Sequence, residues 1–232
     1  MSDQNKYQHQ NHKALSVIVV LLIACISIMV YTIYMIDKMN RKFEMTKTGS
    51  DVDERYEAPT LENSLDTLIL LEQNTWTGLS EETRISVLQK ITDIEQLHLG
   101  LPDKMTVKVD DLSGIHLGEY TDSDHCIRID RTQLKEQSSY VLCEAILHEV
   151  YHNLEYRMVD VYDDADAKLK QLPYMRAAET YKYEFANYID CNDDMENYRK
   201  QTCEIDSNAY AAERVELYIT LVTDAAYGVA AG

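Results

Sequence analysis

The hydrophobic pattern of the chain begins with one long run of uncharged, mostly apolar residues from Ala14 to Ile36. An α-helix of that length can cross the hydrocarbon core of a bilayer. We therefore predict a single transmembrane helix at 14–36, preceded by an N-terminal tail at 1–13 and followed by a polar juxtamembrane linker at 37–58. A cleaved signal peptide is the alternative, but the apolar core of a signal is typically only about 7 to 15 residues long, and no small-x-small cleavage pattern follows the run.

Beyond the linker, the pattern predicts one domain at 59–232. Apolar residues at spacings of three and four predict a helix from Thr60 to about Trp76 and a second helix capped by Ser80. Three short β-prone segments follow, and a cluster of turn-forming residues between the last two predicts a hairpin. The three segments are 105–109, 116–120 and 126–130.

Three more helices are predicted in the C-terminal half. The first begins at Ser138 or Ser139 and runs to about Met158, where an acidic, irregular stretch follows. The second begins at Pro173 and ends near Asp190. A last long helix continues to about Thr223. We expect an α+β fold in which helices pack a small, mostly antiparallel sheet.

The distribution of charge restricts the possible partners of the domain and the side of the membrane on which it lies. The net charge of the chain is −18. Residues 1–47 hold six Lys/Arg and three Asp/Glu. The rest of the chain holds 16 Lys/Arg and 37 Asp/Glu, which is a net charge of −21. A domain this acidic repels phosphate backbones, so we expect no nucleic-acid partner. Four basic residues follow the predicted transmembrane helix, against two and the α-amino group before it. The positive-inside rule thus favours a cytoplasmic domain by a small margin, and the side of this single-pass membrane protein stays open.

Four cysteines lie in the predicted domain, and their spacing contains no CxxC pair, which disfavours a cysteine-rich structural zinc site. In an oxidising compartment, Cys191 and Cys203 would be a plausible short-loop disulfide, whereas in the cytoplasm all four would be small buried apolar residues. The other two are Cys126 and Cys143.

The chemistry of the domain is indicated by an H-E-x-x-H sequence in the helix after the hairpin, formed by His148, Glu149 and His152. Residues i and i+4 lie on the same face of an α-helix, so the two imidazoles can converge on one Zn²⁺ ion. Glu149 is then the candidate general base. A surface helix with two accidental histidines is the alternative, but the residues around the motif are uncharged and partly apolar.

The third ligand is expected from the last helix, in the stretch Cys203-Glu204-Ile205-Asp206-Ser207-Asn208-Ala209-Tyr210-Ala211. An H-E-x-x-H helix followed by a helix with E-x-x-x-N resembles the gluzincin group of zinc peptidases. The form E-x-[acidic or polar]-[small]-N-x-[aromatic]-A resembles its small ImmA/IrrE-type and minigluzincin-like members. The resemblance covers roughly residues 60 to 222, and two residues depart mildly from that pattern, Ser207 and Tyr210.

The resemblance implies a zincin-like domain in which His148, His152 and Glu204 bind zinc and Glu149 is the base. It also implies that Asn208 supports a ligand histidine. Asp206 is the rival third ligand if the last helix is rotated. The resemblance does not select the donor that stabilises the oxyanion, for which the candidates are Tyr181, Tyr183, Tyr198 and His116.

These patterns predict a membrane-anchored zinc metallopeptidase that hydrolyses a peptide or protein substrate by means of a zinc-activated water. The resemblance also implies that strand 126–130, which precedes the active-site helix, lies at an edge of the sheet. The substrate could lie along it as an added strand, or the strand could only complete the sheet. One alternative is a catalytically silent module with a peptidase fold that binds or regulates at the membrane. A second is a tethered interaction protein. The remaining histidines, His98, His116 and His125, are interpreted as surface or loop residues.

Overall fold

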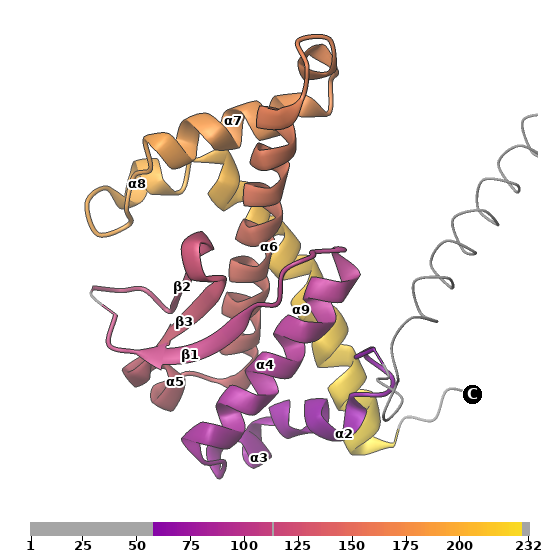
Figure 1. The fold of residues 1–232 in the computed structure, drawn as a ribbon. Coiled ribbons are helices and arrows are strands. Elements are labelled where there is room, and N and C mark those ends of the chain that lie inside the picture. The colour runs from indigo at the N-terminus through magenta and orange to yellow at the C-terminus, as the bar shows by residue number, and fades with distance from the viewer. Residues whose placement is uncertain (1–57, 113, 229–232) are drawn as a thin grey trace, which may run out of the picture. The chain divides into compact units, whose positions relative to one another are not determined.

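A computed structural model describes residues 58–112 and 114–228, which belong to the second of two compact units, Met1–Tyr56 and Glu57–Gly232 (Figure 1). The predicted tail, the transmembrane helix at 14–36 and nearly all of the linker therefore lie outside the described residues. Among the helices that are described, none is both long and apolar enough to span a membrane.

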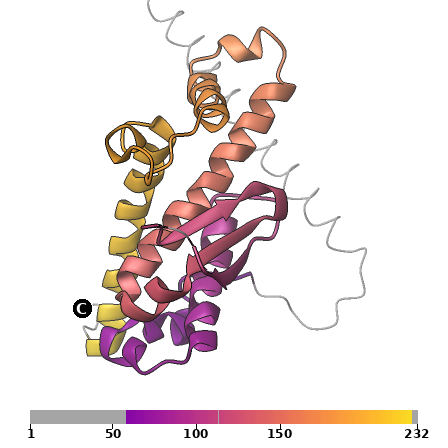
Figure 2. The same cartoon turned by 90° about the vertical axis from the view of Figure 1, so that its left-hand side faces the viewer.

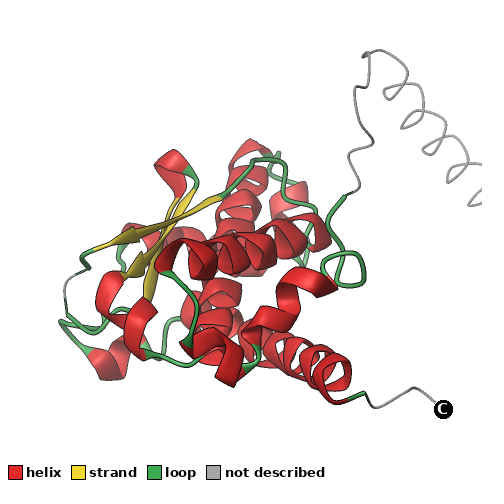
Figure 3. Cartoon of the chain, turned by 90° about the horizontal axis from the view of Figure 1, so that it is seen from below, coloured by secondary structure: helices red, strands yellow, loops and turns green. Residues whose placement is uncertain are grey.

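The predicted α+β class is confirmed, but the sheet is mixed and not mostly antiparallel (Figures 1 and 3). Strands β1 (Thr106–Asp110), β2 (Gly118–Thr121) and β3 (Cys126–Asp130) have the order β1-β3-β2. β1 pairs with β3 in parallel, and β2 pairs with β3 in the predicted antiparallel hairpin. The loop after β1 crosses the end of β3, so β2 lies on the far side of β3 from β1.

This order makes β3 the central strand, and the prediction that 126–130 forms an edge was wrong. The physical reason is burial: Ile127 and Ile129 have no solvent exposure, and Cys126 is fully buried as well. A strand this apolar is more stable with a neighbour on each side, whereas β2 contributes one buried side chain, Tyr120.

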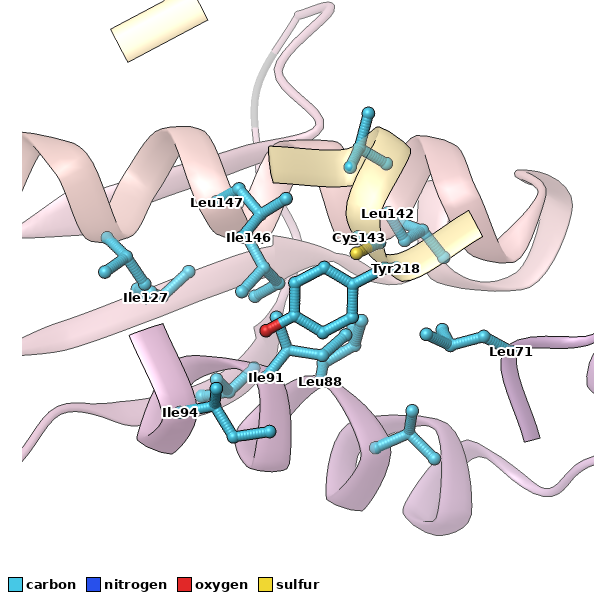
Figure 4. Close-up of a cluster of buried hydrophobic side chains, with 14 of the residues drawn as sticks. Leu71, Leu88, Ile91, Ile94, Ile127, Leu142, Cys143, Ile146, Leu147 and Tyr218 are labelled. Carbon is cyan, nitrogen blue, oxygen red and sulfur yellow. The ribbon is translucent and has the colours of Figure 1, made fainter. Parts of the chain in front are cut away.

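Three long helices build the core, and two of them, α4 and α6, pack on the sheet (Figure 2). α4 (Glu81–His98) begins as predicted, since the Ser80 hydroxyl accepts the backbone N–H of Thr83 at 3.3 Å. α6 (Ser139–Asp164) and α9 (Thr202–Tyr227) pack along each other, and α4 packs on α6. Figure 4 shows Tyr218 of α9 among the apolar side chains of α4 and α6.

Shorter elements complete the domain, and several bounds differ from the prediction. The helix expected at 60–76 is broken into three pieces, because Glu72 leaves helical geometry and caps the last piece by accepting the Thr75 N–H at 2.9 Å. α6 also continues beyond Met158, through most of the stretch expected to be irregular. The short elements are α2 (Leu65–Leu68), η1 (Ile69–Leu71), α3 (Gln73–Thr77), η2 (Asp122–Asp124), α5 (Arg131–Glu136), η3 (Leu169–Gln171), α7 (Met175–Ala186) and α8 (Met195–Tyr198).

A buried polar network joins α4 to α9. Glu95 of α4 is fully buried, and Arg214 of α9 donates to both of its carboxylate oxygens, at 2.8 and 2.5 Å. The hydroxyls of Tyr210 and Tyr218 donate to the same carboxylate at 2.5 and 2.8 Å. A buried carboxylate is costly unless hydrogen-bond donors replace the water that it has lost. Because all three donors come from α9, the network favours the position of α9 in which they reach Glu95.

Candidate metal centre

Two of the long helices bring three potential metal ligands together. His148 and His152 lie one turn apart on α6, with their Nε2 atoms 3.0 Å apart. Glu204 lies in the first turn of α9, with one oxygen 3.3 Å from His148 Nε2 and the other 3.5 Å from His152 Nε2. The three side chains thus form a cluster that could hold a metal ion.

The spacing of these atoms fits a tetrahedral ion. Bonds of about 2.0 to 2.2 Å at tetrahedral angles place nitrogen and oxygen ligand atoms about 3.4 Å apart. The Nε2 atoms of the two histidines, 3.0 Å apart, and His148 Nε2 and Glu204 Oε2, 3.3 Å apart, are close to that value, and the 3.5 Å contact of His152 Nε2 involves the other Glu204 oxygen. Glu204 is fully buried, and its Oε2 has no hydrogen-bond partner among the described residues, which a bound cation would supply.

The electrostatics of the cluster also favour a cation. Burial opposes ionisation of Glu204, but its contacts with His148 and His152 lower the pKa of the carboxyl to about 2. Burial and the neighbouring His148 lower the pKa of His152 to about 3, so its ring is neutral. Burial opposes protonation of His148, yet the pKa of that ring is raised, chiefly by Glu204. A bound metal ion would take the place of the proton on His148.

Two further side chains hold the ligands. Glu155, fully buried on α6, lies with a carboxyl oxygen 2.7 Å from His152 Nδ1, and burial raises the pKa of this carboxyl to about 10. The Asn208 amide donates to the main-chain oxygen of Glu204 at 2.6 Å, and its side chain contributes to raising the pKa of His148. Contacts of this kind fix ring orientation and tautomer.

Sequence reasoning missed Glu155, although its position three residues after His152 is a usable signal, because i and i+3 share a helix face. The rival ligand Asp206 is not part of the cluster. Its carboxylate accepts the hydroxyl of Tyr181 at 2.5 Å.

Glu149 lies beside the cluster and faces a cleft of about 360 Å³. Its carboxylate accepts the main-chain N–H of Tyr120 in β2 at 2.8 Å, and burial raises its pKa to about 7. A carboxyl with a pKa near neutrality can both accept and return a proton. Strand β2 forms one wall of the cleft through Gly118, Glu119 and Tyr120.

Tyrosines form part of another wall. The hydroxyl of Tyr188, which was not among the predicted candidates, donates to Glu204 Oε1 at 2.6 Å, and Tyr198 is close enough to Glu204 for the carboxylate to raise its pKa. Burial raises the pKa of both phenols, so both stay protonated and can donate. Of the predicted oxyanion donors, Tyr198 and His116 line the cleft; Tyr183 is 70% exposed and does not.

The fold and the site together define an α+β protein with a buried two-histidine, one-glutamate cluster at the base of an open cleft. Comparison of the chain with protein-family models, with curated proteins and with solved structures found no match. The four cysteines of the described residues are all free, so the conditional Cys191–Cys203 disulfide is not formed.

Proposed function

We propose that this chain is a zinc metallopeptidase, attached to the membrane by the helix predicted at 14–36. The observation that supports it most is the convergence of His148, His152 and Glu204 next to Glu149 in an open cleft. Two histidines and one glutamate, with access to solvent, are the donor set of a catalytic zinc site. Bound zinc would supply a Lewis acid that lowers the pKa of a coordinated water.

The protein's own groups would carry the proton and position the substrate. Glu149 accepts the proton of the attacking water and passes it to the leaving amine. Tyr198 and Tyr188 are placed to donate a hydrogen bond to the oxygen that develops negative charge. Both roles need only small movements, since these side chains already contact the ligands or the cleft.

The extended substrate would pair with β2. The expectation of pairing along 126–130 does not hold, because both edges of β3 are occupied by β1 and β2. The N–H of Tyr120 points away from β3 and into the cleft, since it donates to Glu149. Main-chain pairing along β2 supplies affinity with little sequence selectivity.

Zinc content is the first test of the proposal. The full chain, purified in detergent and reconstituted with zinc, should lose one zinc per chain in His148→Ala and in Glu204→Ala but none in the control Asp206→Asn. Hydrolysis of an unfolded protein substrate should then disappear in Glu149→Gln while zinc stays bound. Zinc without hydrolysis of any peptide would instead support the silent binding module, and no zinc in the wild type would refute both.

A further inference from the structure

A second group of metal-ligand side chains lies on the rim of the same cleft. His116 stands in the loop before β2, and Asp190 and Cys191 stand in the connection between α7 and α8. Their ligand atoms lie within 4.8 Å of one another. We propose that these three residues, the rim site, bind a second, thiophilic divalent cation of the zinc class. This site goes beyond the proposed catalytic function and does not depend on it.

The separations of the ligand atoms support the assignment. A tetrahedral ion with a Zn–S bond of about 2.3 Å and a Zn–N bond of about 2.0 Å places sulfur and nitrogen about 3.5 Å apart, and nitrogen and oxygen about 3.4 Å apart. In the rim site, His116 Nε2 is 3.6 Å from Cys191 Sγ and 3.3 Å from Asp190 Oδ2. These two separations match those of ligands that share one ion. Cys191 Sγ also lies 3.8 Å from His116 Nδ1, so the imidazole would turn to direct Nε2 at the ion.

The surrounding contacts hold these ligands in place and leave their binding atoms accessible. Asp190 Oδ1 accepts the main-chain N–H of Asn192 at 2.7 Å, so Oδ2 is left for a cation. The Asn192 amide lies 2.9 Å from His116 Nε2 and its oxygen accepts the Ile115 N–H at 3.3 Å, which ties the two segments together. A cation would displace the amide nitrogen from the imidazole lone pair.

The chemistry of the donors selects the cation. A thiolate, an imidazole and a carboxylate favour zinc, cobalt or cadmium over the hard ions magnesium and calcium. Cys191 is buried, and a coordinated divalent cation would itself deprotonate its thiol. With three protein ligands, the fourth position is left to water. An occupied rim site would cross-link the loop before β2 to the α7–α8 connection where both border the cleft.

Cobalt titration tests the rim site separately from the candidate catalytic centre. Only the rim site contains sulfur, so only its occupation produces thiolate-to-cobalt charge-transfer absorption. Cobalt is added to the metal-free full chain in detergent with a non-thiol reductant. The absorption should grow until the rim site of each chain holds one cobalt ion and should then stay constant. The absorption should persist in His148→Ala and Glu204→Ala, which remove the catalytic ligands.

The variants decide the outcome. Cys191→Ser should abolish the absorption, and His116→Ala and Asp190→Asn should each weaken cobalt binding by about tenfold or more, or about 1.4 kcal/mol. The matched controls Cys126→Ala and His98→Ala should leave it unchanged. No charge-transfer absorption in the wild type, or its survival in Cys191→Ser, overturns the proposal. Should Cys191→Ser fail to fold, the partly exposed His116 and Asp190 variants decide the same question.

Discussion

The carboxyl group of Glu155 should control how strongly, and at what pH, the candidate centre binds zinc. In the metal-free protein the pKa of Glu155 is about 10, so at neutral pH the group is protonated and can donate to the neutral ring of His152, 2.7 Å away. If His152 Nε2 held zinc, the ring proton would be on Nδ1 and would be donated to an ionised Glu155. Zinc binding would therefore release one proton from the Glu155–His152 pair.

Replacing Glu155 removes that proton and weakens the support of the ring. Glu155→Ala should lower zinc affinity by about 10- to 100-fold, which is the usual effect of losing a group that orients a ligand histidine, and Glu155→Gln should lie nearer the small end because its amide oxygen still accepts from Nδ1. Between pH 6 and 8, the zinc affinity of the wild type should rise with pH more steeply than that of Glu155→Gln, by up to about tenfold per pH unit.

The assay is competition for zinc with a chromogenic chelator at several pH values, with the exposed Glu179→Gln as the control. Equal affinities and equal pH slopes in the wild type and in Glu155→Gln would refute this account. That result would mean that the 2.7 Å contact neither holds a proton nor orients the ring.

Three further predictions follow from the same geometry. Glu149→Gln should keep its zinc and lose about 10²- to 10⁴-fold in peptide hydrolysis, measured as turnover at matched zinc content; unchanged turnover would exclude Glu149 as the base. Glu95→Ala should lower the free energy of unfolding by about 3 to 5 kcal/mol in urea titrations, because it leaves the Arg214 charge partly buried without its partner. Tyr210→Phe should lower it by only about 1 kcal/mol. Similar losses in the two variants would show that the ion pair does not dominate the network. The metal-free protein should lose thermal stability as pH rises from the ordinary carboxyl range toward 10, because the folded state holds the Glu155 proton more tightly than the unfolded chain does, and Glu155→Gln should flatten this dependence.

Local features of the sequence were sufficient for most helices, for the hairpin and for the histidine pair. Ser80 and Ser138 begin their helices by the predicted side-chain caps, since a cap involves only a few consecutive residues. His148 and His152 were predicted to share a face because helical periodicity alone determines it. The predicted sheet type failed because pairing in parallel or antiparallel depends on the path of the loop between β1 and β2.

By itself, the sequence determined which side chains share one face of one helix and which segments favour strands. The tertiary structure alone decided that β3 is the central strand, that Glu204 and not Asp206 faces the histidines, and that His116 meets Asp190 and Cys191. Each of these depends on how segments far apart in the chain pack together. The physical reason is that local periodicity sets the direction of a side chain within its own element, whereas the burial of apolar faces and of the Glu95 network sets where that element lies.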